Sequence, residues 1–194
     1  PIAGRAMLEH LLASVEALQP ERLAVVVGAG REQIEKAVGA RATTCLQEPQ
    51  FGTGHAVKQA QSAVLGFAGD VLVLYGEVPF VKVATMRAML ERLHAPDAPA
   101  AVVLGFEPAD PLAYGRVIAD DDGCIIKMVE YKDADESERA TRLCNSGLVA
   151  ARAADLFALL ARVGNDNAQG EYFLPDIVNI AIADARPCAV VTAD

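Results

Sequence analysis

The chain has 194 residues, 53% of them hydrophobic, which is enough for one domain with a substantial core. Its net charge of −9 argues against a nucleic-acid interface, because such an interface needs a basic patch. No apolar run approaches the ~20 residues that span a bilayer, and the first residues lack the basic and apolar regions of a signal peptide.

The first half of the chain alternates between helical and extended patterns. Apolar residues at helical spacing predict helices at 4–18, 31–38, 54–65 and 83–94. Short apolar runs predict strands at 23–27, 43–46, 71–75 and 100–106. This alternation is typical of βαβ units, in which helices cover both faces of a parallel sheet.

The pattern changes after residue 115. Two short apolar runs, 116–119 and 124–129, flank Asp120-Asp121-Asp122-Gly123, which predicts an antiparallel hairpin. The remaining elements are predicted as strand, helix, helix and strand, at 146–150, 153–163, 174–185 and 189–192. We find no linker or internal repeat. The sequence therefore predicts a single α/β domain over 1–194, with a mostly parallel sheet, helices on both faces and an inserted antiparallel hairpin.

The cysteines are scattered along the chain and show no CxxC spacing. In a chain of this length, that pattern predicts free thiols in a reducing compartment, and hence a cytoplasmic protein. They are Cys45, Cys124, Cys144 and Cys188.

The segment DVLVLYGEVP, residues 70–79, places an acid beside a predicted strand end. The run 71–75 is rich in Val and Leu, which predicts a strand buried on both faces. In open parallel sheets, ligands bind outside the carboxyl ends of the strands. Glu77 has no Lys or Arg beside it and could hold a divalent metal, since Mg²⁺ prefers one or two carboxylates plus substrate phosphates. The alternative is an acid in a solvated loop.

The segment LQEPQFGTGH, residues 46–55, lies between a predicted strand and a predicted helix. Gly52 and Gly54 bracket Thr53, and glycines let the backbone approach a ligand closely. A helix N-terminus also offers free N–H groups. Gln47 can donate and accept together, as recognition of a uracil-like imide edge requires. The structural alternative is a turn in which Thr53 caps the helix.

Three further motifs carry polar groups. Gly115 could offer a backbone N–H and Arg116 a charge, or the two could form a tight turn with a solvated Arg. Glu130 follows an apolar run and could accept hydrogen bonds from sugar hydroxyls, or it could pair with Lys132 or Arg116 at the surface. Asn145 could bind a sugar hydroxyl or amide, or bond its own backbone.

The order and spacing of the motifs resemble one known family. Along the chain stand LQEPQFGTGHA, LYGEVP, DPLAYGRV, VEYKDA, CNSGL and NAQGEYF. The opening AGRAMLEHLL resembles the helix that follows the family's nucleotide-binding loop. Together these motifs resemble the N-terminal domain of bacterial N-acetylglucosamine-1-phosphate uridylyltransferase, which is usually bifunctional, with a C-terminal acetyltransferase domain. The resemblance covers nearly the whole chain.

The resemblance implies a Rossmann-like nucleotidyltransferase fold and a cytoplasmic reaction that supplies peptidoglycan and lipopolysaccharide synthesis. UTP and N-acetylglucosamine 1-phosphate would give UDP-N-acetylglucosamine and pyrophosphate, by in-line attack of the sugar phosphate on the α-phosphate. No catalytic residue is implied, because positioning and charge neutralisation by Mg²⁺ would carry the reaction. By position, the nucleotide would contact Gln47, Gly52, Thr53, Tyr75, Gly76 and Glu77. The metal would bind Glu77, and the sugar would contact Gly115, Glu130 and Asn145.

The sequence departs from the family pattern in three places. The family's Gly-rich phosphate loop should precede Pro1, and its second metal ligand, an Asn, should follow Asp194. A doubly wound domain also normally opens with a central strand, so we expect residues before Pro1 in the natural protein. The family has Asp where this chain has Glu77, which is one methylene longer, whereas Mg²⁺ demands near-ideal octahedral geometry.

Three functional hypotheses follow. The first is the uridylyltransferase domain. The second is a non-catalytic nucleotide-sugar-binding domain, which Glu77 favours. The third is a nucleotidyltransferase for another sugar 1-phosphate or a cofactor precursor. The expected partners are UTP, N-acetylglucosamine 1-phosphate and UDP-N-acetylglucosamine, with no nucleic acid and no membrane, and a homo-oligomer could form through regions outside this sequence.

Overall fold

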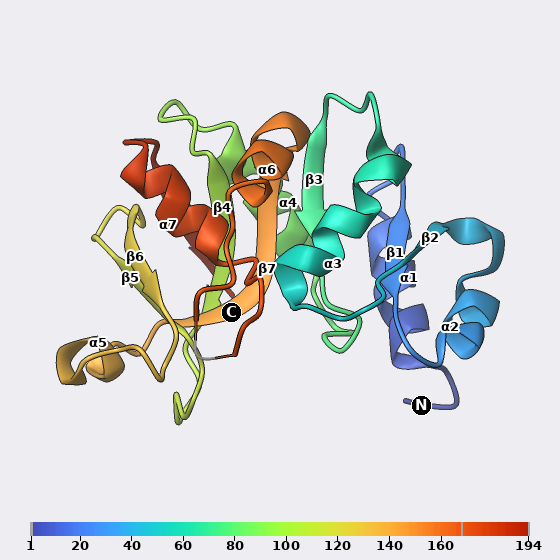
Figure 1. The fold of residues 1–194 in the computed structure, drawn as a ribbon, viewed down its shortest axis with the longest axis horizontal. Helices are drawn as coiled ribbons and strands as arrows, with labels where there is room; N and C mark the ends of the chain where they lie inside the picture. The colour runs from blue at the N-terminus through green and yellow to red at the C-terminus, as the bar shows by residue number, and fades with distance from the viewer. Residues whose placement is uncertain (1, 168, 194) are drawn as a thin grey trace. The chain divides into compact units, whose positions relative to one another are not determined.

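The computed structural model describes residues 2–167 and 169–193, so Ala168 of the NAQGEYF motif lies outside the described residues. The chain divides into two compact units (Figure 1). Unit 1 contains the chain up to Phe67, Leu74–Arg87 and Val163–Leu174. Unit 2 contains Ala68–Val73, Ala88–Arg162 and the chain from Pro175 onward.

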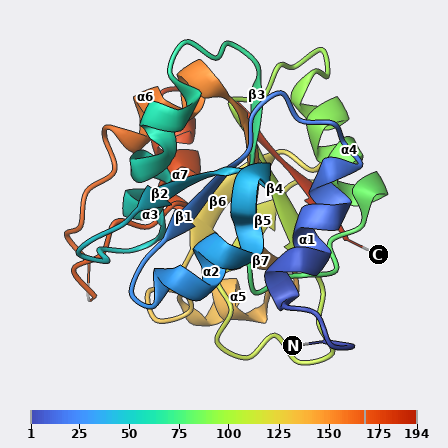
Figure 2. The ribbon, with the colours of Figure 1, turned by 90° about the vertical axis from the view of Figure 1, so that its right-hand side faces the viewer.

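Unit 1 is built around a parallel pair of strands, β1 (Ala24–Val27) and β2 (Thr43–Leu46), with Val26 opposite Cys45. Helices α2 and α3 both contact β1, and α1 contacts α2 (Figure 2). Helix α1 buries Leu11, Leu12 and Val15, which lie on one face because of their spacing. The helices of this unit are α1 (Met7–Glu16), α2 (Arg31–Val38), α3 (Thr53–Gln59) and the 3-10 turns η1 (Gly39–Arg41) and η2 (Ala60–Val64).

Unit 2 is built around a six-stranded sheet. Its strands are β3 (Asp70–Val73), β4 (Ala101–Phe106), β5 (Arg116–Ala119), β6 (Ile125–Val129), β7 (Cys144–Arg152) and β8 (Cys188–Thr192). Its helices are α5 (Glu136–Ala140), α6 (Ala153–Leu160) and α7 (Asp176–Ala183), while α4 (Val83–Leu93) begins in unit 1 and ends in unit 2. Helix α7 contacts β4, β6 and β8, and α6 contacts β3 and β7.

Strand directions in the sheet of unit 2 are mixed, with β4 and β8 parallel and the other pairings among the described residues antiparallel. Strands β3 and β4 both pair antiparallel to β7, and β8 pairs parallel to β4, so β3, β4 and β8 run the same way. The predicted hairpin is confirmed, because β5 and β6 pair antiparallel. The α/β class is therefore confirmed. Strand β7 extends beyond the predicted 146–150, because it pairs with β3, β4 and β5 at residues on both sides of that range.

The core of unit 2 is centred on β4, whose residues Ala101, Val102 and Val103 are fully buried. A continuous apolar run of this kind is expected where both edges of a strand are paired and both faces are covered. Helix α5 was not predicted, because its sequence, ESERA, has no apolar stripe. Its N-terminus is instead capped by Asp135, whose side chain accepts the Glu138 N–H at 2.8 Å.

The prediction of a strand at 71–75 buried on both faces was wrong in its end and its burial. Strand β3 ends at Val73, and all four of its residues are only partly buried. Within the described residues, β3 pairs with β7 alone, so one of its edges is not covered by a strand. The helix predicted at 54–65 is also shorter than expected. Helix α3 ends at Gln59, and the 3-10 turn η2 continues the segment.

All four cysteines are free, as the sequence predicted. Burial raises the pKa of the Cys188 thiol to about 11, so this thiol stays protonated at neutral pH. In the described part of the chain, no helix combines the length and apolarity needed to cross a membrane.

Candidate functional site

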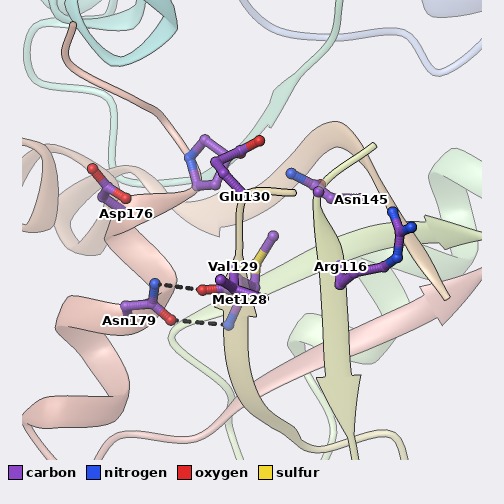
Figure 3. A pocket seen from close by; sticks show the side chains of 9 residues that line it. Arg116, Met128, Val129, Glu130, Asn145, Asp176 and Asn179 are labelled. Atoms are coloured by element: carbon purple, nitrogen blue, oxygen red, sulfur yellow. Dashed lines mark hydrogen bonds between the residues drawn. The ribbon is translucent and has the colours of Figure 1, made fainter. Parts of the chain in front are cut away.

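A pocket in unit 2 brings together the three residues that the sequence assigned to sugar binding. Gly115, Glu130 and Asn145 all line it, together with Arg116, Asp176 and Asn179 (Figure 3). The three predicted residues come from different segments of the chain. The sheet order β6-β5-β7 explains why they meet, since each lies at or beside the same end of one of three adjacent strands.

Backbone pairing sets the spacing of these residues. Arg116 of β5 pairs with Val129 of β6, which puts the preceding Gly115 beside the following Glu130. On the other side, the Asn145 N–H donates to the Gly115 carbonyl oxygen at 2.9 Å. A Cβ atom on Gly115 would lie 3.3 Å from both oxygens of Glu130. Glycine at this position therefore leaves room for the carboxylate.

Glu130 is a half-buried acid that has no cationic partner among the described residues. Burial raises the pKa of its carboxyl, and the neighbouring carboxylates of Asp176 and Asp133 raise it further. Burial also raises the pKa of Asp176. Among the described residues, no hydrogen bond or ion pair joins the Glu130 side chain to a protein donor. Such a carboxylate suits a neutral ligand with hydroxyl or amide donors, and it disfavours a phosphate in the same place.

The two asparagines of the pocket differ in what they leave for a ligand. The Asn145 Oδ1 accepts the Gly147 N–H at 2.8 Å, so its own backbone is bonded as the structural alternative proposed. Its side chain is nevertheless directed toward Glu130 (Figure 3). Asn179 uses both ends of its amide on Met128, donating to the carbonyl oxygen at 2.9 Å and accepting the N–H at 3.0 Å. It thereby occupies the free edge of β6.

The predicted nucleotide residues Gln47, Gly52 and Thr53 lie together in unit 1. Gln47 is buried, and its Nε2 donates to the Gly52 carbonyl oxygen at 2.9 Å and lies 3.1 Å from His55 Nδ1. Gly52 rather than Thr53 is the N-cap of α3, so the alternative of a Thr53 cap was wrong. The Thr53 hydroxyl instead accepts the Leu174 N–H at 2.9 Å.

Gly52 packs closely against a distant part of the chain. Its φ of +100° is unfavourable for any other residue, and an added Cβ would lie 2.7 Å from the Tyr172 carbonyl oxygen. Gly54 donates its N–H to the same oxygen at 2.8 Å. The close backbone approach expected at these glycines is therefore made to Tyr172.

Tyr75, Gly76 and Glu77 form a turn in unit 1. The Val78 N–H donates to the Tyr75 carbonyl oxygen at 3.0 Å. Glu77 was expected just past a strand end, but β3 ends at Val73, four residues earlier, and Glu77 is exposed. Within residues 2–167 and 169–193, its carboxylate has no ion-pair partner, and no group of three or more His, Cys, Asp or Glu could hold a metal.

Two pocket residues were missed by the sequence analysis. Asp176 and Asn179 lie three residues apart on α7, and both line the pocket. Their spacing in DIVNIAIA was the available signal, because two polar residues at i and i+3 share one face of an otherwise apolar helix. The alternatives in which Arg116 is a solvated side chain, or pairs with Glu130, are contradicted, because Arg116 is buried and no ion pair joins it to Glu130 among the described residues. Arg116 is 2% exposed and binds backbone carbonyls.

Comparison with known proteins agrees with the motif analysis. Residues 1–140 match the model of the MobA-like NTP transferase domain. The chain belongs to this family. Members of this nucleotidyltransferase type generally use a divalent metal ion. Among the described residues, the exposed carboxylate of Glu77 has no ion-pair partner, so its oxygens are open to the kind of cation that takes few protein ligands beside phosphate oxygens.

Relatives of this NTP transferase domain are identical at many positions over its whole length. The bifunctional protein GlmU of Novosphingobium aromaticivorans is 70% identical over 194 residues, and that of Sphingopyxis alaskensis is 66% identical over 194 residues. The bifunctional protein GlmU of Rhizorhabdus wittichii is 58% identical over 195 residues. In each case, all of this chain is covered but only 43% of the relative. The resemblance inferred from the motifs is confirmed.

A solved structure shows the same fold. The crystal structure of UDP-glucose pyrophosphorylase complexed with UDP-glucose superposes with a TM-score of 0.77 at 15% sequence identity. The match covers all of this chain and 81% of the other. The predicted nucleotidyltransferase fold is thereby confirmed.

Proposed function

We propose that this chain is the uridylyltransferase part of a longer protein, making UDP-N-acetylglucosamine and pyrophosphate from UTP and N-acetylglucosamine 1-phosphate. The observation that carries the proposal is the meeting of Gly115, Glu130 and Asn145 around one pocket. Their arrangement follows from strand pairing. The similarity to the bifunctional protein GlmU over the whole chain supports the same reaction, because the motifs here resemble that enzyme's first domain.

The unit 2 pocket suits the sugar half of the substrate. The Glu130 carboxylate accepts hydrogen bonds from hydroxyl groups, and the Asn145 amide faces the same space (Figure 3). Because Glu130 and Asp176 are both acidic, the pocket favours the neutral ring of the sugar and repels its 1-phosphate. This polarity orients the sugar so that the phosphate points out of the pocket.

The unit 1 residues suit the nucleotide half. The Nε2 of Gln47 is engaged by Gly52 and His55, which leaves its Oε1 to accept the imide N–H of uracil. Glu77 would hold Mg²⁺ together with phosphate oxygens, and the bound ion would neutralise the charge of the reacting phosphates. Tyr75 and Gly76 belong to the same turn and would border the phosphates. None of these residues needs to form a covalent bond, because positioning carries much of phosphoryl transfer.

The test is the release of pyrophosphate from UTP and N-acetylglucosamine 1-phosphate with Mg²⁺, using the full-length natural protein that contains this chain. We expect turnover with this pair and much weaker turnover with glucose 1-phosphate. The Glu107→Gln variant is a control for substitution of Glu130. Like Glu130, Glu107 directly follows a strand, here β4, but it is exposed. The variant should turn over at the wild-type rate.

Two results would contradict the proposal. Tight binding of UDP-N-acetylglucosamine without turnover favours a non-catalytic binding domain. In that case, Glu77→Asp should restore activity, because it supplies the family's shorter acid. Turnover only with another sugar 1-phosphate, or only with another nucleotide, favours a different nucleotidyltransferase.

A further inference from the structure

Arg116 is a buried cation that has no acidic partner in the part of the chain that the structure describes. Arg116 is 2% exposed, and its guanidinium donates to backbone carbonyl oxygens of the loop just before it and of Arg139. Nη2 donates to Leu112 at 3.1 Å and Nη1 donates to Tyr114. Longer bonds run from Nη1 to Pro111 and from Nε to Arg139, both at 3.4 Å. Burial of an arginine is tolerated only when its donors are satisfied, and here the backbone satisfies them.

Three of these carbonyls belong to the loop that leads into Gly115. The side chain of Leu112 is 65% exposed and that of Tyr114 is 47% exposed, although the Tyr114 ring packs edge-on against Phe106 at 5.0 Å. Leu112 also has a φ of +40°, in the left-handed region that a leucine seldom adopts. A strained and exposed loop needs an external restraint to keep one conformation. The Arg116 guanidinium supplies one through Pro111, Leu112 and Tyr114.

The same guanidinium also reaches the segment after Glu130. Its Cζ lies 5.5 Å from the ring centroid of Tyr131, the residue that follows Glu130. Arg139 stacks on that ring at 4.9 Å, and its Nε donates to the Tyr131 carbonyl oxygen at 3.1 Å. Cation–π contacts of this length are attractive, and more so when they are shielded from water. Arg116 therefore links the loop before Gly115 to the turn after Glu130.

We propose that Arg116 is a positioning residue that holds Gly115 against the Glu130 carboxylate and so shapes the sugar pocket. The inference rests on the proposed function of this pocket. Arg116 acts through the backbone rather than on the substrate, since its side chain points away from Glu130 and Asn145 (Figure 3). Its loss lets Gly115 move, and small misplacements of a binding group are costly.

The experiment measures steady-state kinetics of Arg116→Met and Arg116→Lys in the full-length natural protein, varying each substrate separately. We expect the KM for N-acetylglucosamine 1-phosphate to rise about tenfold or more in Arg116→Met, and less in Arg116→Lys, which keeps a donor and a charge. The KM for UTP should stay unchanged. A merely structural role would lower the active fraction, and hence kcat, without raising the KM for N-acetylglucosamine 1-phosphate relative to the KM for UTP.

Arg142→Met is the matched control. Arg142 is exposed and donates to a carbonyl oxygen of the same loop, that of Pro108, at 2.8 Å, but it does not contact Tyr131. Its removal should leave both KM values at wild-type levels. If neither Arg116 variant folds, Tyr131→Leu removes only the stacked ring. It should raise the KM for N-acetylglucosamine 1-phosphate less than Arg116→Met would, and leave the KM for UTP unchanged.

Hydrogen exchange separates this inference from the proposed function. The Asn145 N–H donates to Gly115, so its exchange should accelerate in Arg116→Lys, whereas the Ala100 N–H, bonded to Pro187, should not change. If the wild-type protein is inactive but the Asn145 N–H exchanges faster in Arg116→Lys than in the wild type, the proposed function is overturned and the positioning role is kept. Unchanged exchange at Asn145, or equal rises in both KM values, overturns the positioning role.

Discussion

The end of β6 and the turn after β3 look alike in the sequence and differ in the folded protein. Each joins a short apolar run to an acid, Glu130 in one case and Glu77 in the other. Glu130 directly follows its strand, is half buried and lines a pocket. Glu77 lies four residues beyond Val73 and is exposed. The comparison teaches that the surroundings of the acid, and not its place in the sequence, set its chemistry.

A third acid isolates the cause. Glu107 directly follows β4, as Glu130 follows β6, yet it is exposed and lies 3.9 Å from Arg142. Glu130 differs because helix α7 packs against its strand, β6. Asp176 on that helix raises the pKa of Glu130 beyond the effect of burial. Glu107 and Glu130 therefore form a natural pair for testing whether burial creates the site.

The largest expected effect comes from Glu130→Gln in the full-length protein. The variant keeps the shape of the side chain but loses the ionised acceptor, which is worth roughly 10- to 100-fold for a hydrogen bond to a charged group. We expect kcat/KM for N-acetylglucosamine 1-phosphate to fall by about this factor. The thermal midpoint should stay the same or rise, because the substitution removes a partly buried carboxylate that has no ion-pair partner among the described residues.

Glu107→Gln is the control, with kinetics and midpoint expected to match the wild type. Equal losses in the two variants would break the comparison, because they would show that burial does not distinguish the acids. An unchanged kcat/KM in Glu130→Gln would remove Glu130 from the sugar site.

A smaller effect is expected at Glu77. Replacement of an exposed ligand costs little, so Glu77→Ala should weaken Mn²⁺ binding in the presence of UTP by on the order of fivefold. The bound ion can be followed by electron paramagnetic resonance, independently of turnover. Glu77→Asp should bind the ion at least as tightly as the wild type. Unchanged binding in Glu77→Ala would assign the metal to other residues.

The smallest effect is the pH dependence of stability. The folded state raises the pKa of Glu130 above its ordinary value of 4.5, so the folded protein holds the proton more tightly than the unfolded chain. This contribution to stability is fully present below pH 4.5 and is lost as pH rises through the folded pKa. Denaturation of wild type and Glu130→Gln across this range should show their difference in free energy of unfolding changing in that window. A constant difference would mean that Glu130 titrates as in water.

Most elements of the fold could be predicted because local patterns dictate them. Helix α2 and strands β2 and β5 have the predicted bounds, and α2 is flanked by Gly30 and Gly39. Strand β3 was placed too far along, because an apolar run does not say where pairing stops. Helix α5 was missed because it is fixed by the Asp135 cap rather than by a buried face.

The candidate site could be predicted in part. Gly115, Glu130 and Asn145 were found from motif order, and they line one pocket. Asp176 and Asn179 were missed because they lie on a helix that folds over β6 from the far end of the sequence. The burial of Arg116 was missed, because the sequence offered only a ligand-binding charge or a solvated side chain, and backbone carbonyls leave no sequence signal.

The sequence by itself determined the α/β class, the hairpin and the residue types of the site, because these depend on periodicity and turn chemistry over a few neighbouring residues. Only the tertiary structure decided which acid is buried, since Gly115, Asn145 and Asp176 line the pocket of Glu130 from other segments of the chain. It likewise decided why Gly52 must be glycine, because the Tyr172 carbonyl oxygen occupies the place of its Cβ. Burial and close contact are set by distant segments, and a local pattern carries no record of them.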